Sequence, residues 1–159
     1  KKLKKDQPEI IKRAKEIANS IGKKMPFIYS YSNFEGIALR FKQQLNENSK
    51  RHAIFNVIPE MNHNEIVGWT NSNPNMVPVL IRNLNEADEI KNRFEALKNT
   101  AWKDIGIVEI FATCESHLAK MLETIYIGDM VSIELAKLNK VDPTPVKVIE
   151  NLKNKLGGK

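Results

Sequence analysis

The sequence has a single cysteine, no apolar run long enough to cross a membrane and none of the common glycine-rich phosphate-binding motifs. With Cys114 alone, an internal disulfide and a multi-cysteine metal site are both excluded. No stretch approaches the ~18 apolar residues of a membrane span. The lysine-rich start is not followed by the apolar segment of a signal peptide. We therefore expect a cytoplasmic protein with no membrane partner.

Several catalytic signatures are also missing. The chain has no G-x-G-x-x-G and no P-loop, which argues against the usual nucleotide sites. It has no G-x-S-x-G elbow of a serine hydrolase. His63-Asn64-Glu65 matches the His-x-Glu of zinc deaminases, but the paired cysteines that those enzymes require are absent. We expect neither a metal nor a cofactor.

Positive charge is in excess but dispersed. The formal net charge is +6, from 25 lysines and arginines against 19 aspartates and glutamates. Lysines gather at the two ends of the chain and otherwise scatter, without the interleaved aromatic residues of a nucleic-acid-binding stripe. This distribution favours solvated helix surface over nucleic-acid binding, which remains the less favoured alternative. A basic chain still attracts anionic metabolites.

Short apolar strands alternate with amphipathic helices along the 159 residues. The strands are expected at 26–30, 53–58, around 79–81 and at 105–111. The helices are expected at 1–22, leading in, and at 34–45, 85–97, 113–138 and 146–156. This alternation predicts a single doubly wound α/β domain, flavodoxin-like, with a parallel sheet of about four to five strands and helices on both faces.

Particular residues predict where these elements begin and end. Gly22 ends the first helix, Asn85 caps the helix after the third strand and Thr113 starts the long helix. Pro78 is expected at the entrance of the third strand or on a sheet edge. The stretch 118–138 is apolar on most sides, so we expect it to be largely buried.

Glu47 and His63 are the first candidates for chemistry. They lie 16 residues apart, and each is flanked by asparagine on both sides. Glutamate and histidine are the side chains best suited to moving protons near neutral pH. At about 100° per residue, Glu47 points away from the apolar face of its helix. It therefore faces either solvent or a site completed by something outside this domain.

Lys153, Ser30 and Ser32 are weaker candidates. Lys153 flanks the apolar stripe of the last helix, so its stem either covers apolar surface or directs the ammonium into a polar cleft. Ser30 and Ser32 lie in a hydroxyl-rich loop that opens a helix. Such a loop either binds an anion at the helix N-terminus or caps the helix in the ordinary way.

Two runs in this region carry a resemblance to a known family. Asn46-Glu47-Asn48-Ser49-Lys50 and residues 56–69, from Asn56-Val57-Ile58-Pro59 to Gly68-Trp69, closely resemble the C-terminal half of bifunctional phosphoglucose/phosphomannose isomerases of archaea and some bacteria. The segments 128–132, 142–145 and 149–153 resemble that family's closing segments, in matching order. This family has two sugar isomerase (SIS) domains, and the chain resembles the second.

The resemblance implies metal-free aldose–ketose isomerisation of glucose 6-phosphate or mannose 6-phosphate with fructose 6-phosphate. Glu47 would match the base that moves a proton between C1 and C2 through a cis-enediol. His63 would match the residue that assists ring opening, contributed across a dimer interface in related isomerases. Lys153 would match a lysine near the ring oxygen. Ser30 and Ser32 remain candidate substrate contacts.

The resemblance also implies partners. The phosphate-gripping loops belong to the family's first half, so we expect an N-terminal SIS half, a homodimer and little or no activity from this chain alone. Surface meant for the first half should remain uncovered. The alternative function is a non-catalytic SIS module that binds a sugar phosphate and regulates a partner.

Overall fold

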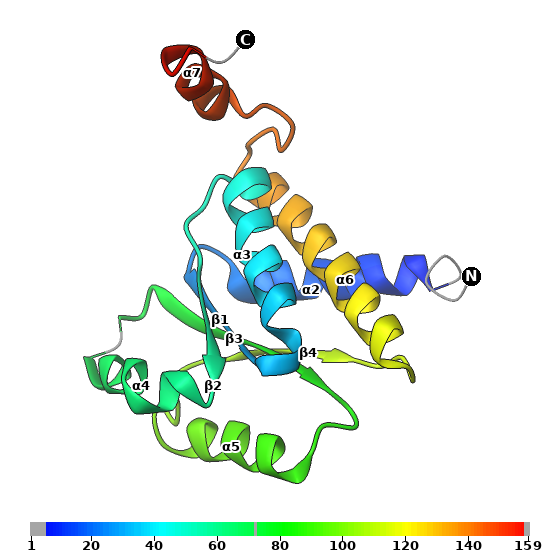
Figure 1. The fold of residues 1–159 in the computed structure, drawn as a ribbon, viewed down its shortest axis with the longest axis vertical. Helices are drawn as coiled ribbons and strands as arrows, with labels where there is room; N and C mark the ends of the chain where they lie inside the picture. Colours follow the sequence, from blue (N-terminus) through cyan, green and yellow to red (C-terminus); the bar gives the residue numbers. More distant parts are fainter. Residues whose placement is uncertain (1–5, 72, 158–159) are drawn as a thin grey trace.

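The structure, a computed structural model, describes residues 6–71 and 73–157 and is built on a parallel four-stranded sheet (Figure 1). The strands are β1 (Met25–Tyr31), β2 (Ile54–Ile58), β3 (Met76–Asn83) and β4 (Val108–Ala112). They are ordered β2-β1-β3-β4, and all three pairings are parallel. The predicted doubly wound α/β fold is confirmed, with four strands.

Helices cover both faces of this sheet. One layer contains α2 (Gln7–Ile21), α3 (Glu35–Ser49) and α6 (His117–Leu138), where α6 packs against the other two. The opposite face carries α5 (Asp88–Asn99) and the short elements η2 (Glu60–His63), α4 (Glu65–Gly68) and η3 (Trp69–Asn71) (Figure 1). The chain winds from β1 to β2 on one side and from β3 to β4 on the other, so its direction reverses between β1 and β3. Ligands in open α/β sheets bind at such a reversal, beyond the carboxyl ends of the strands.

Helix α2 follows its apolar spacing closely. Its buried residues are Ile10, Ala14, Ala18 and Ile21, which recur every three or four positions on one face. Gly22 ends the helix with φ of 54° and donates its N–H to the Ala18 carbonyl, as predicted. The first five residues of the expected 1–22 segment lie outside the described residues.

Helix α5 begins three residues later than predicted. Asn85 does not cap it: the Asn85 N–H is bound by the Asn83 side chain at 2.8 Å, which makes a turn instead. Pro78 is the third residue of β3, opposite Phe27 of β1 and one residue before the pairing with β4 begins at Val79. The proline therefore lies near the entrance of a central strand.

Helix α6 begins at His117 rather than at Thr113, with the Ser116 side chain accepting a hydrogen bond from the Ala119 N–H. Thr113 is instead held by Glu123 of the same helix, through both its N–H and its hydroxyl. The expectation that 118–138 is largely buried holds for most of the stretch, in which only Leu118, Leu122, Lys137 and Leu138 are exposed. One face of α6 is buried against α2 and α3, whereas Leu118 and Leu122 are 66% and 46% exposed.

The last helix, α7 (Lys147–Lys155), stands apart from the sheet beyond the ends of α3 and α6 (Figure 1). None of its residues is buried. Its apolar side chains include Val148 and Leu152, which are 82% and 56% exposed. The helix is therefore an arm with several apolar side chains that the rest of this chain leaves exposed.

Candidate functional site

Glu47 lies in the last turn of α3, at the edge of the sheet where the strands begin. Helix α3 starts near the C-terminal end of β1 and runs back to the N-terminal end of β2, because the two strands are parallel. Its last turn therefore lies at the N-terminal ends of the strands. The neighbouring Leu45 and Ser49 are buried, whereas Glu47 is exposed. The prediction that Glu47 points away from its own core is confirmed.

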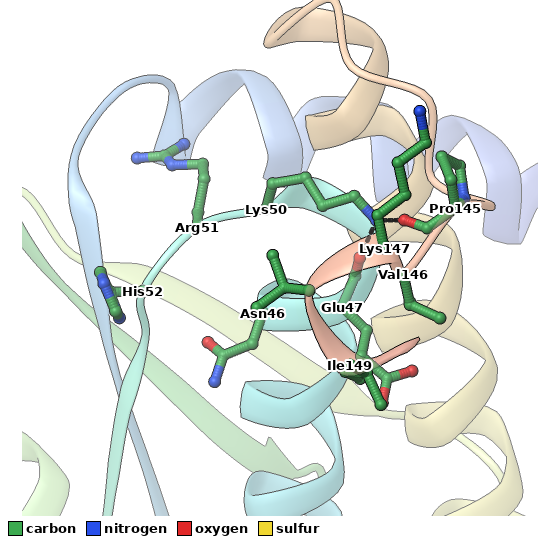
Figure 2. Close-up of a pocket in the computed structure, with 10 residues that line it drawn as sticks. Asn46, Glu47, Lys50, Arg51, His52, Pro145, Val146, Lys147 and Ile149 are labelled. Atoms are coloured by element: carbon green, nitrogen blue, oxygen red, sulfur yellow. Dashed lines mark hydrogen bonds between the residues drawn. The ribbon is translucent and has the colours of Figure 1, made fainter. Parts of the chain in front are cut away.

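A cavity of about 610 Å³ opens beside Glu47 (Figure 2). It lies between the end of α3 and the start of α7, and its lining includes Arg51, His52 and Ile149. Asn46 also lines it, and the Asn46 Oδ1 atom is buried without a hydrogen-bond partner. An orphaned buried carbonyl costs free energy unless something outside the chain supplies a donor.

Lys50 fixes the geometry of this cavity. It follows α3 in the left-handed conformation, with φ of 55°. Its ammonium donates to the Glu47 carbonyl oxygen at 2.6 Å and to the carbonyl oxygens of Pro143 and Pro145 at 3.3 and 2.8 Å. These three contacts tie the connection between α6 and α7 to the end of α3. The base of the α7 arm is therefore anchored beside Glu47.

Lys153 is carried by the arm and is exposed. The sequence leaves open whether its ammonium enters a polar cleft, and it does not line any of the described cavities. No residue of α7, which carries most of the apolar stripe that it flanks, is buried in the domain. The structure therefore brings the first turn of α7 next to Glu47 but leaves Lys153 pointing to solvent from the same helix.

His63 ends η2, just after the carboxyl end of β2, and is exposed. The segment that carries it is fixed through Glu65 two residues later. One Glu65 oxygen accepts from the Tyr29 hydroxyl at 2.5 Å and the other from the Asn56 side chain at 2.7 Å. Trp69 in turn donates to the Tyr29 hydroxyl at 2.9 Å. Burial and the nearby Glu65 carboxylate raise the pKa of Tyr29 well above its ordinary value, so this tyrosine stays a hydrogen-bond donor.

Glu47 therefore lies near the N-terminal ends of the strands, and His63 lies near their C-terminal ends. Strand β2 runs between them from its amino to its carboxyl end, and five residues of a strand span roughly 15 Å. No single small substrate bridges that distance within one chain. The pair that the sequence sets 16 residues apart is separated by the fold.

The two serines are separated as well. Ser30 lies inside β1, is fully buried and has no partner for its hydroxyl oxygen. Ser32 is exposed at the start of the following turn and lines a second cavity, at the carboxyl edge of the sheet. Only Ser32 is placed to contact a ligand. That second cavity also contains Lys120 and Glu86, which the sequence analysis missed. The only sign of Lys120 in the sequence is a lysine within an apolar helical stretch.

Two other classes of site are absent from residues 6–71 and 73–157. No three histidine, cysteine, aspartate or glutamate side chains in this part of the chain are grouped as metal ligands. Nor is any of its helices long and apolar enough to span a bilayer.

The fold is that of the sugar isomerase class. A glucose-6-phosphate isomerase-like protein of Thermus thermophilus superposes with a TM-score of 0.71 at 21% identity, over 89% of this chain and 46% of that one. Residues 10–156 match the model of the bacterial phospho-glucose isomerase C-terminal SIS domain. The chain belongs to this family, as the resemblance implied.

Curated relatives support the same assignment. A bifunctional phosphoglucose/phosphomannose isomerase of Aquifex aeolicus (strain VF5) is 39% identical, over 97% of this chain and 49% of the relative. The protein of the same name from Caldicellulosiruptor bescii is 40% identical, over 98% of this chain and 47% of the relative. The chain thus spans about half the length of the curated relatives it matches.

Proposed function

We propose that the chain is, as a whole, the C-terminal SIS domain of an isomerase that interconverts glucose 6-phosphate or mannose 6-phosphate with fructose 6-phosphate. The observation that carries the proposal is the exposed Glu47 carboxylate beside a cavity of about 610 Å³, in a chain that matches about half the length of its relatives. The reaction belongs to carbohydrate metabolism, and we place it in the cytoplasm, without a cofactor.

Glu47 is the base in this proposal. In the open-chain aldose, the proton on C2 lies next to the C1 carbonyl and is therefore acidic. Glu47 removes it, the electron pair forms the C1–C2 double bond of a cis-enediol, and O1 takes up a proton. The proton then returns from Glu47 to C1 while O2 loses its proton and becomes the ketose carbonyl. A well-placed general base contributes about 10²–10⁴-fold to the rate.

His63 assists ring opening, because the hexose phosphates enter as closed rings and a proton must move to the ring oxygen. Its position at the opposite edge from Glu47 supports a site that takes His63 from a second copy of the chain. The proposal therefore requires a homodimer. Each active site draws its base from one subunit and its ring-opening residue from the other.

Lys153 acts near the ring oxygen and reaches it through movement or docking of the α7 arm. The exposed apolar residues of that arm, such as Leu152, support a docked position in the whole enzyme. The substrate phosphate is held by the N-terminal SIS half. The 159-residue chain alone therefore does not turn over fructose 6-phosphate.

The test uses the whole enzyme and this chain side by side. Fructose 6-phosphate conversion is followed by enzymatic detection of glucose 6-phosphate and mannose 6-phosphate. We expect turnover only when the N-terminal half is present, and a loss of at least about 10²-fold in kcat for Glu47→Gln. Glu9→Gln, an exposed glutamate of α2, is the matched control. A near-normal rate in Glu47→Gln removes Glu47 as the base, and robust turnover by the chain alone refutes the division of labour between the halves.

A further inference from the structure

The second cavity lies at the carboxyl edge of the sheet and has a volume of about 520 Å³. The ends of β1 and β3 and the first turn of α6 form it, and Tyr31, Asn83 and Lys120 are among its lining residues. These two strands are the neighbours between which the winding direction reverses. The cavity therefore occupies the position where open α/β sheets take their ligands, at the opposite edge from Glu47.

Lys120 supplies a buried positive charge to this cavity. The residue is only 9% exposed, and its ammonium donates to the Asn83 Oδ1 atom at 3.3 Å. Among the residues that the structure describes, no carboxylate forms an ion pair with it. A buried ammonium group with one neutral partner keeps unused hydrogen-bond donors and has no direct ion-pair partner. An anion bound in the cavity would satisfy both.

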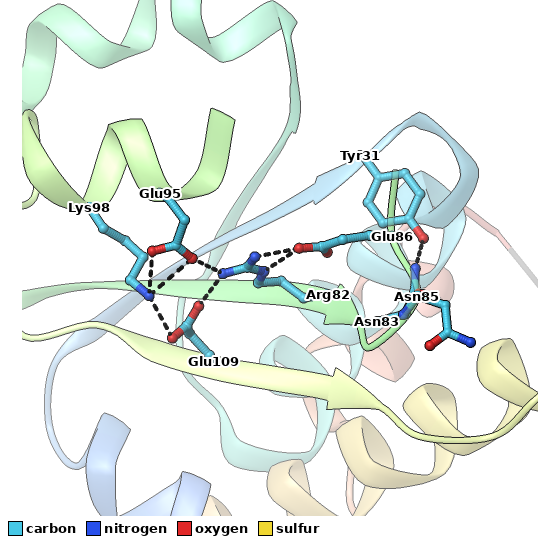
Figure 3. A network of polar contacts seen from close by, with 8 residues as sticks. All are labelled: Tyr31, Arg82, Asn83, Asn85, Glu86, Glu95, Lys98 and Glu109. Carbon is cyan, nitrogen blue, oxygen red and sulfur yellow. Dashed lines mark hydrogen bonds and ion pairs between the residues drawn. The ribbon is translucent and has the colours of Figure 1, made fainter. Parts of the chain in front are cut away.

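Asn83 and Tyr31 extend the polar wall next to Lys120. The Asn83 amide group donates to the Tyr31 hydroxyl oxygen (Figure 3). Burial raises the pKa of Tyr31, so the hydroxyl keeps its proton and can donate it to a ligand. Lys120, Asn83 and Tyr31 thus present donors from α6, β3 and β1 to the same space.

Glu86 presents an acceptor on the wall of the same cavity. Its side chain is 4% exposed, and one oxygen is bound by the Arg82 guanidinium. The other oxygen is buried without a partner. Arg82 also binds Glu95 and Glu109 at 2.8 and 2.7 Å, which holds it in place behind Glu86 (Figure 3). Since Arg82 binds only one oxygen of Glu86, the other oxygen keeps its acceptor capacity for a donor such as a hydroxyl group.

We propose that this cavity binds a small anion that carries hydroxyl groups, such as a phosphorylated polyol or a sugar acid. The anionic group contacts Lys120, and a hydroxyl group donates to the free oxygen of Glu86. Ser32 and Asn33 line the cavity and offer further polar contacts, while Ile90 contributes an apolar wall.

The site lies at the opposite end of the strands from Glu47 and adjoins the segment that carries His63. Ile58 and Pro59 also line the cavity and lead directly into η2, which ends at His63. A bound anion therefore touches the chain just before the segment that carries His63. Binding of the anion in this cavity does not require that Glu47 be a catalytic base.

The test is isothermal titration calorimetry of the 159-residue chain with three probes: fructose 6-phosphate, gluconate and inorganic phosphate. We expect binding of fructose 6-phosphate or gluconate, weakened at least about 10-fold in Lys120→Met, a loss of the size that a charge-assisted contact supplies. Glu86→Gln puts an amide donor in place of the free carboxylate oxygen. It should weaken the binding of the hydroxylated probes, fructose 6-phosphate and gluconate, several-fold, without a comparable change in the binding of inorganic phosphate. Lys137→Met, an exposed lysine on the same helix, is the matched control.

The results distinguish a phosphorylated ligand from a carboxylate, and binding in this cavity from binding in the cavity beside Glu47. Preference for fructose 6-phosphate identifies a phosphorylated ligand, and preference for gluconate identifies a carboxylate. NMR of the unsubstituted chain should show shifts of the Asn83 and Asn85 side-chain amide signals with either ligand, independently of any variant. Unchanged binding in Lys120→Met, or no binding of any probe at millimolar concentration, overturns the proposal. Binding that is lost in Glu47→Gln instead places the ligand at the other edge and also overturns it.

Discussion

Replacing Glu123 by glutamine should destabilise the fold more than any exposed substitution on the same helix. The Glu123 side chain is 4% exposed, and its carboxylate accepts from the Thr113 N–H, the Thr113 hydroxyl and the Cys114 N–H at 2.7, 2.7 and 2.9 Å. It also pairs with Arg13 at 3.3 Å. Glu123 thus closes the loop between β4 and α6, where the sequence predicts the start of a helix.

The magnitude follows from these contacts. A hydrogen bond to a charged acceptor is worth about 1 kcal/mol more than a neutral one, so three such bonds and the Arg13 contact sum to about 4 kcal/mol. Burying a charge rather than an amide in the native protein offsets about half of this. We therefore expect Glu123→Gln to lower the free energy of unfolding by about 2 kcal/mol, a shift of roughly 1 M in the urea midpoint.

The difference in the free energy of unfolding between the unsubstituted chain and Glu123→Gln should depend on pH. The hydrogen bonds from Thr113 and Cys114 outweigh burial and hold the pKa of Glu123 below its ordinary value. The stabilisation is therefore fully present above the unfolded-state pKa of about 4.3 and is lost as the pH falls through the lower folded-state value. Glutamine does not titrate, so the two stabilities should converge in acid.

Urea titrations followed by circular dichroism at about pH 7 and below about pH 4, on either side of the glutamate pKa, measure both effects. Glu134→Gln is the matched control on α6, because Glu134 pairs only with Lys137, which is 66% exposed, among the described residues. The Glu134 side chain is 16% exposed, but a pair whose lysine is exposed contributes only about 0–1 kcal/mol. A loss under about 0.5 kcal/mol at neutral pH for Glu123→Gln, or a difference that grows in acid, refutes the reasoning.

Three further predictions concern packing and buried polar groups. Gly128→Ala should cost about 1 kcal/mol in a thermal melt, because the new Cβ would lie 3.0 Å from a ring carbon of Phe41 and this overpacking, about 1–3 kcal/mol, exceeds the helix-propensity gain of about 1 kcal/mol; an unchanged or raised melting temperature would show that the helices separate freely. Tyr29→Phe leaves a Glu65 oxygen without its donor and should cost about 1–3 kcal/mol in urea, with Tyr126→Phe as control. Arg82→Met should cost about 3 kcal/mol or more at neutral pH and less in acid, since three carboxylates lose their common cation.

The sequence was sufficient for the fold because its apolar strands and helix faces are regular. The strand at 54–58 and the buried face of α2 lie where periodicity placed them. Two helices start later than predicted because of local polar contacts. The Asn83 side chain accepts a hydrogen bond from the Asn85 N–H, and the Glu123 carboxylate accepts one from the Thr113 N–H. Such side-chain contacts compete with helix capping and leave no trace in an apolar pattern.

The candidate site could be predicted only in part. Helix geometry correctly predicted that Glu47 points outward, because the buried face of α3 is defined by residues that are close together in the sequence. The separation of Glu47 from His63 could not follow from their spacing, since it depends on the sheet edge at which each segment ends. Lys120 and Glu86 line one cavity only because the end of β3 and the start of α6 lie side by side there, and the proximity of distant segments cannot be read from a local pattern.

The placement of Glu47 and His63 at opposite edges has a consequence for mixtures of inactive proteins. If two subunits share each active site, Glu47→Gln and His63→Ala subunits should repair one another. A mixed dimer would then contain one site with both lesions and one site with neither. Unfolding and refolding equal amounts together should restore about a quarter of the wild-type activity, because about half of the dimers are mixed and each has one intact site. Two separately purified, inactive preparations would thus yield an active enzyme by exchange of subunits alone.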